Sequence, residues 1–577
     1  MCATSSLDPA DLPREHSRGA GMREGLQEHV RSFVAGAVSF VMLNRSSRVH
    51  GRYIRFAVPA IALLMCGACA SLPKTRTVTP SSALTDTADS TSLGHVVAQR
   101  MIELNAPSGI NLIPRGPDAF LARLTLVDLA ERSLDLQYYI WHDDTVGKLL
   151  IGAVLRAADR GVRVRLLIDD VGASPDDQTL LLLDAHPNIE VRLFNPIASR
   201  SARALWMITD FSRVNQRMHN KSITADNQLT IVGGRNIGDE YFEAGTAMNY
   251  ADLDALAIGA AVTAVSARFD RYWNSPVVYG ISELRHDTPA PGELERAAAG
   301  LRAFEEQQRQ ASYAQAMHDS RLSQEIRDGR VSFSPARIEV TADDPGKVEG
   351  AGKDPSHNLM PQLRPQFDSA RDSVVLVSPY FVPRKGGVEF LRSLRARGIK
   401  VRVLTNGLAS TDVVPVFGKY KKYRRELLEA GVELYEIDPL HDVDGPAGPL
   451  PTPEAAKAAD TKAPSAALHG KVLSFDCLRF FVGSMNLDPR SAFTNTEIGF
   501  LVDAPDVAGA LCQGLDGTIA RAAFRLELTT DASGSRHLEW VDSEAGGERR
   551  FTSEPRAGRW LRFKAWMYGI LPIESLM

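Results

Sequence analysis

Apolar residues occupy every second position in residues 134–140, and this period of two is typical of a β-strand. In residues 149–157 the apolar positions take helical spacing instead, and Gly161 is placed to end that helix. Residues 162–169 then form a second apolar run. The order of these segments predicts a β-α-β unit and therefore a parallel sheet.

The same pattern recurs at residues 373–407, which contain a strand, a helix, a glycine at position 398 and a second strand. Within this repeat, residues 400–404 align with residues 163–167. A repeat with so large a period indicates domain duplication rather than a solenoid. The expected fold is therefore α/β, with two similar halves that each contain a mixed, largely parallel sheet flanked by helices.

Changes in composition divide the chain into parts. Residues 71–95 are rich in Ser, Thr, Pro and Ala, which is typical of a linker. The expected parts are residues 1–70 as an N-terminal extension with a signal-like segment, 71–95 as the linker, 96–285 as the first half, 286–355 as a helical connector and loop, and 356–577 as the second half, with a flexible insertion at 442–464 and an amphipathic C-terminal tail.

Residues 42–70 have the order of a secretory signal. Four arginines precede an apolar run at residues 56–65, and small residues and Cys69 follow. The run is too short to span a bilayer, which takes about 20 apolar residues. The stretch around Cys69 resembles a bacterial lipoprotein box, so Cys69 is a lipidation candidate, with ordinary signal cleavage and a retained anchor as alternatives. The expected location is the bacterial cell envelope, associated with the membrane and facing the periplasm.

Composition and charge exclude few classes of protein. The chain has 577 residues, 44% of them hydrophobic, and a formal net charge of -4. These values are ordinary for a globular protein and give no sign of a nucleic-acid binder. Of the five cysteines, Cys66 and Cys69 are spaced as C-x-x-C, but no second pair completes a zinc site. We therefore expect neither a metal site nor a disulfide framework.

Two copies of one motif, H-x-K-x4-D, carry the candidate chemistry. Each copy is followed at the same spacing by a Gly-(Gly/Ser)-x-Asn tail, and a chance match of two such motifs is rare. The catalytic candidates are His219, Lys221 and Asp226 in the first copy and His469, Lys471 and Asp476 in the second, with tails that end at Asn236 and Asn486.

These residue types suit the cleavage of a phosphodiester. His and Lys two positions apart on a strand face the same side, so each pair points into one site. A phosphodiester is an anion with a poor leaving group, so it needs charge neutralisation, a nucleophile and an acid. Two lysines can hold the non-bridging oxygens, one histidine can attack phosphorus, and the other can protonate the leaving oxygen. No metal or cofactor is required for this chemistry.

The duplicated motif resembles that of the phospholipase D superfamily. The segments at residues 233–242, 252–254 and 483–499 and the tail at 554–577 are most similar to its bacterial cardiolipin synthase branch. The resemblance implies two phospholipase D-type halves with one active site at their interface and a covalent phosphohistidine intermediate. It favours His219 as the nucleophile and His469 as the acid and later the base, with the reverse assignment as the alternative.

The resemblance further implies phosphatidyl transfer, with phosphatidylglycerol or phosphatidylethanolamine as candidate substrates and a membrane surface as a partner. The alternatives are a phospholipase D hydrolase that releases phosphatidic acid, a nuclease of the same superfamily, and a catalytically silent scaffold. A nuclease needs a basic groove, for which residues 419–425 are the candidate, with contact to anionic lipid headgroups or a solvated helix face as the alternatives for this cluster. The export signal argues against a nucleic-acid partner, and an accessory protein is a further candidate partner.

The remaining site residues are expected to support the histidines and lysines. Asp226 and Asp476 are grouped with the catalytic residues through the motif, but their odd spacing from the lysines predicts a turn or salt-bridge role rather than proton transfer. By the resemblance, Asp252 and Glu497 are expected to orient the imidazoles. The residues expected to bind the substrate phosphate are Asn236, Asn486 and Ser484.

Two groups of aromatic residues have open interpretations. One group follows the first strand of each half and is expected either to line the substrate entrance or to pack in the core. The C-terminal tail interleaves basic and aromatic residues, which suits either a lipid interface or a packed helix. The first group consists of Tyr138, Tyr139, Trp141, Tyr380 and Phe381.

Overall fold

The computed structural model describes residues 72–73, 78–86, 90–172, 176–200, 203, 207, 210–245, 248–328, 330–348, 358–440, 465–544 and 547–572. They belong to one compact unit, Ser71–Met577. The signal-like segment with Cys69 and the insertion at 442–464 lie outside the described residues, so what was expected of them stays a prediction. Within the described ranges, no helix has the length and apolar character needed to span a bilayer.

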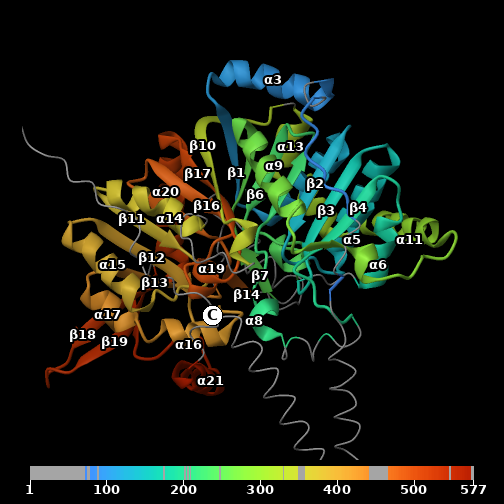
Figure 1. The fold of residues 1–577 in the computed structure, drawn as a ribbon. Helices are drawn as coiled ribbons and strands as arrows, with labels where there is room; N and C mark the ends of the chain where they lie inside the picture. Colours follow the sequence, from blue (N-terminus) through green and yellow to red (C-terminus); the bar gives the residue numbers. More distant parts are fainter. Residues whose placement is uncertain are drawn as a thin grey trace, which may run out of the picture. The chain divides into compact units, whose positions relative to one another are not determined.

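The first half is one sheet with helices packed on it (Figure 1). Its elements are α3 (Ser92–Leu104), β1 (Ser108–Ile113), α4 (Gly116–Leu129), β2 (Ser133–Tyr138), α5 (Thr145–Asp159), β3 (Arg163–Asp169), α6 (Asp177–Asp184), β4 (Ile189–Phe194), α8 (Phe211–Val214), β5 (Ser222–Ala225), β6 (Leu229–Gly233), η2 (Asp239–Tyr241), β7 (Met248–Ala251), β8 (Asp254–Gly259), α9 (Ala260–Trp273), β9 (Val278–Gly280) and α10 (Ile281–Leu284). The strands pair in the order β9-β4-β3-β2-β5-β6-β8-β1. As predicted, α5 connects β2 to β3, and it buries the apolar side of its surface.

The second half repeats this plan after the connector helices α11 (Glu293–Gln308), α12 (Ser312–His318) and α13 (Arg321–Arg327). Its elements are β10 (Ser334–Ala342), η3 (Pro345–Lys347), α14 (Leu359–Ser369), β11 (Ser373–Val377), α15 (Arg384–Ala396), β12 (Lys400–Asn406), α16 (Val414–Tyr420), α17 (Arg424–Glu429), β13 (Glu433–Ile437), β14 (Ser465–Leu468), β15 (Val472–Phe475), β16 (Arg479–Gly483), α19 (Pro489–Phe493), β17 (Ile498–Asp503), α20 (Pro505–Ala522), β18 (Ala523–Thr530), β19 (Arg536–Glu544), β20 (Gly547–Phe551) and α21 (Arg559–Ile570). Because β10 pairs with β1 and also with β17, the two sheets are continuous.

The α/β class and the two similar halves are confirmed, but the sheets are less parallel than expected. Among the described strands, parallel pairing within each half is found between three neighbours, β2-β3-β4 in the first half and β11-β12-β13 in the second. The strands that carry the motifs join these sheets as antiparallel hairpins. A hairpin needs only a two-residue turn, whereas a parallel pair needs a crossover, so the short motif segments favour antiparallel pairing.

Each hairpin turn is built around the aspartate of the motif. Asp226 and Asn227, and likewise Asp476 and Cys477, have φ between 51° and 55° and are the first two residues of the three-residue turn that joins each pair of strands. The Asp226 carboxylate accepts three backbone N–H groups at the start of β2, at 2.8 to 3.0 Å. The Asp476 carboxylate accepts the equivalent N–H groups at the start of β11. Both side chains therefore anchor turns, which agrees with the predicted turn role.

A disulfide between Cys477 and Cys512 links the second motif's hairpin turn to α20. The sequence analysis expected no disulfide framework, and this expectation is wrong for these two residues. They are separated by 35 positions and lie on a turn and a helix, so no local spacing pattern identifies them as partners.

Part of the expected linker is docked on the first half. The carbonyl oxygens of Thr79 and Ser81 accept hydrogen bonds from Arg192 and Arg165, and the Ser81 hydroxyl accepts one from the indole of Trp273. Residues 78–86 thus satisfy buried guanidinium groups, which a free linker does not do.

The basic cluster at 419–425 is also different from its expectation. Lys419 is buried and donates to the carbonyl of Gly569 on α21. Arg424 is buried, lies 4.6 Å from the ring centroid of Phe417 and pairs with Glu436 at 2.7 Å. These two cations hold the C-terminal helix and the core together, so they do not form a groove for nucleic acid.

Candidate active site

The two histidines come together where the halves cross. His219 lies just before β5 rather than within it, and its backbone N–H donates to the carbonyl of Thr496 at 2.8 Å. His469 lies before β15, and its N–H donates to the carbonyl of Ala251 at 2.8 Å. Strands β7 and β14 pair in parallel beside this crossing. Each histidine is therefore held at its backbone by the opposite half.

The imidazole of His219 is backed by Glu497 from the second half. Its Nδ1 atom lies 2.8 Å from the Oε2 atom of Glu497. The hydroxyls of Ser484 and Ser491 donate to the two oxygens of this buried carboxylate. Burial opposes ionisation of Glu497, but the charge and hydrogen bond of His219, the charge of Lys221 and the hydrogen bond of Ser484 outweigh it and lower the pKa of the carboxyl.

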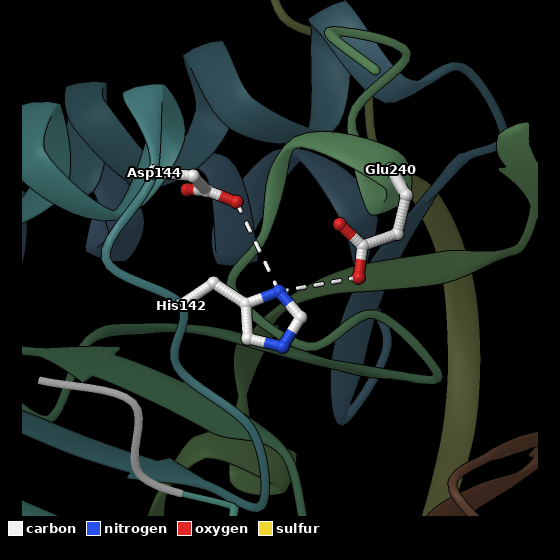
Figure 2. Close-up of side chains that lie close together, drawn as sticks. All are labelled: His142, Asp144 and Glu240. Atoms are coloured by element: carbon white, nitrogen blue, oxygen red, sulfur yellow. Dashed lines mark ion pairs between the residues drawn. The ribbon is translucent and has the colours of Figure 1, made fainter. Parts of the chain in front are cut away.

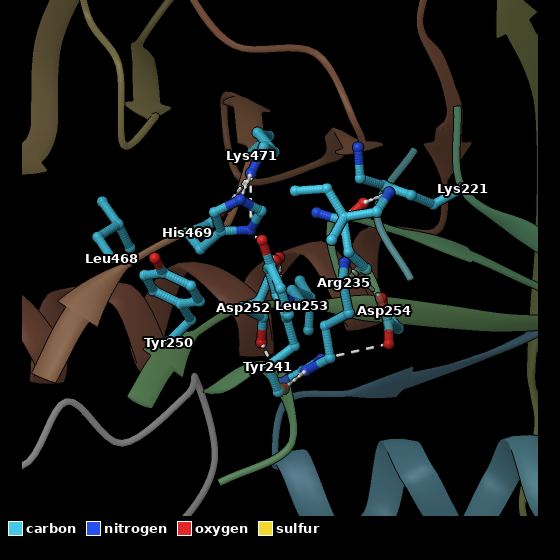
Figure 3. A network of polar contacts seen from close by, with 12 residues as sticks. Lys221, Arg235, Tyr241, Tyr250, Asp252, Leu253, Asp254, Leu468, His469 and Lys471 are labelled. Atoms are coloured by element: carbon cyan, nitrogen blue, oxygen red, sulfur yellow. Dashed lines mark hydrogen bonds and ion pairs between the residues drawn. The ribbon is translucent and has the colours of Figure 1, made fainter. Parts of the chain in front are cut away.

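The imidazole of His469 is backed in the same way by Asp252 from the first half. Its Nδ1 atom lies 2.5 Å from the Oδ2 atom of Asp252, and Figure 3 shows the ring between Asp252 and Lys471. A Cβ atom on Gly234 would meet the Asp252 carboxylate at 2.2 Å, so this motif glycine makes room for the carboxylate. The expected pairing of Asp252 and Glu497 with the imidazoles thus agrees with their positions.

The two lysines are buried beside the histidines. The Nζ atom of Lys221 donates to the carbonyl of His219 at 2.6 Å, and that of Lys471 lies 3.1 Å from the Nε2 atom of His469. Burial lowers the pKa of Lys471 to about 8, although Asp252 opposes the shift. Burial also lowers the pKa of His219 to about 4, against the charge of Glu497. At neutral pH His219 is therefore an uncharged imidazole, the form that can act as a nucleophile.

The expected phosphate ligands divide into two groups. The side-chain oxygen of Asn236 accepts the N–H of Ile140 at 3.2 Å, and that of Asn486 is buried without a hydrogen-bond partner. That oxygen can only accept hydrogen bonds, so a phosphate oxygen would bind the amide NH2 group of Asn486 rather than this atom. The Ser484 hydroxyl donates to Glu497 and accepts the N–H of Ile498 at 3.0 Å, so it positions the carboxylate rather than facing the phosphate.

Two aromatic side chains that were not expected at the site lie beside the imidazole of His469. The ring centroids of Tyr241 and Tyr250 both lie 5.1 Å from that of His469. The hydroxyl of Tyr250 donates to Asp412 at 3.2 Å. Tyr241 lies in the segment at 233–242, which carried the family resemblance, whereas Tyr250 and Asp412 have no local signal.

The five aromatic residues that were expected either at the substrate entrance or in the core do not all have the same position. Three lie in the core, and two lie beside the site. Tyr138, Trp141 and Phe381 are buried in the core. Tyr139 lies at 5.1 Å from His219 between ring centroids, and the Tyr380 hydroxyl donates to Asp412 at 2.7 Å. The entrance interpretation therefore stays a prediction for these two tyrosines and is dropped for the three residues in the core.

Two arginines and an aspartate hold the segment between β7 and β8 that carries Asp252. Arg235 donates to the carbonyl of Asp252 at 2.8 Å and lies 3.4 Å from Asp254 (Figure 3). Asp254 also pairs with Arg123 at 2.8 Å. All these side chains are buried, so the network positions Asp252 from the side that faces away from His469.

Among the described residues, one group of His, Asp and Glu side chains lies close enough together to hold a metal ion (Figure 2). The Nδ1 atom of His142 is 3.3 Å from Glu240 and 3.9 Å from Asp144. The oxygens of Asp144 accept the N–H groups of Gly147 and Asp239. The Glu240 carboxylate accepts a hydrogen bond from His142 and thereby raises the pKa of the imidazole. The group is accounted for by a helix cap and an ion pair, and the absence of a catalytic metal stays a prediction.

The fold and the site define a class of enzyme with a duplicated H-x-K motif and one active site shared by two α/β halves. The family model described as "Cardiolipin synthase, PLD-like domain" matches residues 124–273 and 363–517. The chain is 40% identical over 479 residues to Cardiolipin synthase C of Escherichia coli (strain K12), covering 81% of this chain and 96% of that protein. The chain therefore belongs to the phospholipase D superfamily, in the family of cardiolipin synthase PLD-like domains, as the motif resemblance implied.

Three further proteins show lower identity to the chain. An uncharacterized protein of Helicobacter pylori (strain ATCC 700392 / 26695) is 32% identical over 427 residues, covering 72% of this chain and 80% of that protein. Cardiolipin synthase 1 of Bacillus anthracis is 24% identical over 389 residues, covering 67% and 62%. The solved structure of a phosphatidylserine synthase from Haemophilus influenzae Rd KW20 has a TM-score of 0.49 and 13% identity, covering 74% of this chain and 91% of that one.

The buried lysine predicts a pH limit for turnover. Because Lys471 carries its charge only below its pKa of about 8, kcat/KM for bis(p-nitrophenyl) phosphate, whose leaving group needs no acid from His469, should fall as the pH rises through that value. Arginine stays protonated at all these pH values, so the residual activity of Lys471→Arg should lose this alkaline limb. A wild-type profile that stays flat from pH 7 to about pH 10, or a limb that Lys471→Arg retains, would contradict the assignment.

Proposed function

We propose that the protein is a phosphatidyltransferase of the cardiolipin synthase type. It transfers a phosphatidyl group from a donor phospholipid to a primary hydroxyl of an acceptor such as phosphatidylglycerol. The observation that carries the proposal is the pair of imidazoles, each backed by a carboxylate from the opposite half and accompanied by a lysine. The 40% identity to Cardiolipin synthase C of Escherichia coli (strain K12) supports the choice of reaction within the family.

In the first step, the Nε2 atom of His219 attacks phosphorus, and the bond from phosphorus to the headgroup oxygen breaks. The Nδ1–H of His219 donates to Glu497, whose charge stabilises the ring as it becomes positive. His469 gives a proton to the departing headgroup oxygen, which leaves as an alcohol. The lysines and Asn486 bind the non-bridging oxygens and stabilise the charge that develops on them.

In the second step, the acceptor hydroxyl gives its proton to His469 and attacks phosphorus, and the bond to His219 breaks. His469 must be protonated when the first step begins. In the substrate-free site, burial and the charge of Lys471 lower the pKa of His469. A bound phosphate anion offsets the charge of both lysines and raises that pKa, so substrate binding favours the protonated acid.

A location in the bacterial envelope, facing the periplasm, fits two observations. The disulfide between Cys477 and Cys512 is of a kind that persists in oxidising compartments. The signal-like segment at residues 42–70 would direct export. Together they support catalysis on the outer side of the bacterial inner membrane, on phospholipids and away from chromosomal DNA.

The C-terminal helix supplies a surface for contact with a membrane. Its inner side packs Ala565 and Gly569 toward α16, whereas Trp560, Phe563 and Trp566 are 67%, 46% and 54% exposed. Basic residues are interleaved with these aromatic side chains, which suits the interface between lipid headgroups and acyl chains. Both interpretations of the tail therefore apply, each to one side of the helix. Asp412, beside the tyrosines of the site, lies shortly before α16, so α21 is near the entrance.

A lipid analysis tests the reaction. In a bacterial host without cardiolipin synthases, expression of the intact chain should produce cardiolipin, and His219→Ala should produce none because the nucleophile is missing. His318→Ala, which changes an exposed histidine, is the matched control and should behave like the intact chain. Accumulation of phosphatidic acid without cardiolipin would show a hydrolase instead, and unchanged lipids with folded protein would also contradict the proposal.

The exposed face of α21 can be tested separately. The double variant Trp560→Ala/Trp566→Ala should bind vesicles of phosphatidylglycerol and phosphatidylethanolamine at least about tenfold more weakly, because it removes two large apolar contacts. Ile102→Ala/Leu129→Ala removes exposed apolar side chains elsewhere and should bind like the wild type. Sedimentation with vesicles measures both variants, and equal binding of the double tryptophan variant and the wild type would rule out this surface.

A further inference from the structure

An apolar pocket opens in the second half between α14, α15 and α19. Its volume is about 600 Å³, within the usual range for sites that bind small molecules. Side chains from all three helices and from the loops beside them line it, and nearly all of the lining is hydrocarbon. The principal lining residues are Phe367, Phe381, Phe390, Leu391, Leu487 and Phe493.

The pocket shares a wall with the active site. Leu487 and Asp488, which line the pocket, directly follow the phosphate-ligand candidate Asn486 in the chain. Phe381 pairs with Leu487 as an isolated β-bridge, which fixes this loop against the end of β11. The buried carboxyl of Asp488 also acts electrostatically on Lys471. A molecule in the pocket is therefore separated from the phosphate site by a single loop.

Pseudo-symmetry identifies the equivalent groove in the first half. The N–H of Val382 donates to the carbonyl of Leu487 at 2.8 Å, and the N–H of His142 donates to the carbonyl of Ile237 at the same distance. The matching isolated bridges are Phe381 to Leu487 and Trp141 to Ile237. The groove between α4, α5 and η2 thus corresponds to the pocket between α14, α15 and α19.

The first-half groove is filled by the protein itself. Phe120 of α4 lies 5.3 Å from Phe242 between ring centroids, and 6.2 Å from Tyr313 of the connector helix α12. Met360 precedes Phe381 by as many residues as Phe120 precedes Trp141, so Met360 takes the place of Phe120. Ala492 follows Leu487 by as many residues as Phe242 follows Ile237, so Ala492 takes the place of Phe242. The smaller side chains line the open pocket. The same scaffold is therefore closed in one half and open in the other.

We propose that the pocket holds an acyl chain of the phospholipid whose phosphate lies between the two lysines. This proposal rests on the proposed function, because it takes the substrate to be a phospholipid. An acyl chain has the properties that the pocket requires of its ligand. It is apolar over its whole length, as the lining is, and it is joined to an anionic phosphate, whose site lies one loop away. An amphipathic helix of a partner protein, which would occupy the pocket as α12 occupies the first half, is the occupant that the experiment must exclude.

The substitution Ala492→Phe tests the pocket by restoring the residue that fills the first-half groove. It should lower kcat/KM for dioleoyl phosphatidylglycerol in vesicles by roughly tenfold or more, because the chain loses its apolar contacts. Turnover of bis(p-nitrophenyl) phosphate, which has no acyl chain, should stay within about twofold of the wild type. Ala396→Phe adds the same ring on the exposed side of α15 and should leave both activities unchanged.

Photocrosslinking gives a second readout that does not depend on a variant folding. Wild-type protein is irradiated with phosphatidylglycerol that carries a diazirine at the end of one acyl chain. Adducts should map to residues 359–369, 384–396 or 487–493, and Ala492→Phe should reduce them. Adducts confined to other segments, as a helix occupant would produce, or equal activity of Ala492→Phe and wild type on both substrates, would overturn the proposal.

The two proposals fail in different ways. If the wild type makes cardiolipin but gives no adducts in the pocket, the pocket assignment is wrong and the reaction stands. If the probe labels the pocket but no phosphatidyl group is transferred, the reaction is wrong and the acyl-chain site stands.

Discussion

Each imidazole of the site depends on a carboxylate that the opposite half supplies. Glu497 holds His219 at 2.8 Å, and Asp252 holds His469 at 2.5 Å. Neither half contains both members of either pair, so one half alone cannot orient its own histidine. The duplication therefore produces one site rather than two, and the continuous sheet and the β7–β14 pairing keep the crossing in register.

The same crossing supplies the opposite charges that allow many ionisable groups to be buried together. Two lysines and two histidines lie in a site where an uncompensated charge would be costly. Asp252 and Glu497 provide the compensating negative charge, and hydrogen bonds from Ser484 and Ser491 satisfy the oxygens of Glu497. The two lysine ammonium groups can still bind an anion. This suits a phosphodiester, whose phosphate is negatively charged. Burial of the site also limits the access of water. Phosphatidyl transfer requires this limit, because water would otherwise replace the acceptor hydroxyl.

Local signals in the sequence were enough for the duplicated α/β halves and for the motif histidines and lysines, because periodicity and spacing record them directly. The orienting carboxylates Asp252 and Glu497 were reached only through the family resemblance, since each lies far along the chain from its histidine. Features that depend on distant segments meeting were missed. Cys477 bonds to Cys512, and Lys419 lies buried under the C-terminal helix, yet neither contact leaves a pattern in the residues around it.

The most direct test of the account is to trap the covalent intermediate. His469→Ala would be mixed with bis(p-nitrophenyl) phosphate, whose leaving group needs no acid, and the quenched protein would be digested and analysed by mass spectrometry. The account predicts a phosphoryl adduct on His219, because the second step lacks its base and the intermediate accumulates. A wild-type protein that carries the adduct on His469, or a His469→Ala variant that turns over the substrate with no adduct on His219, would contradict it.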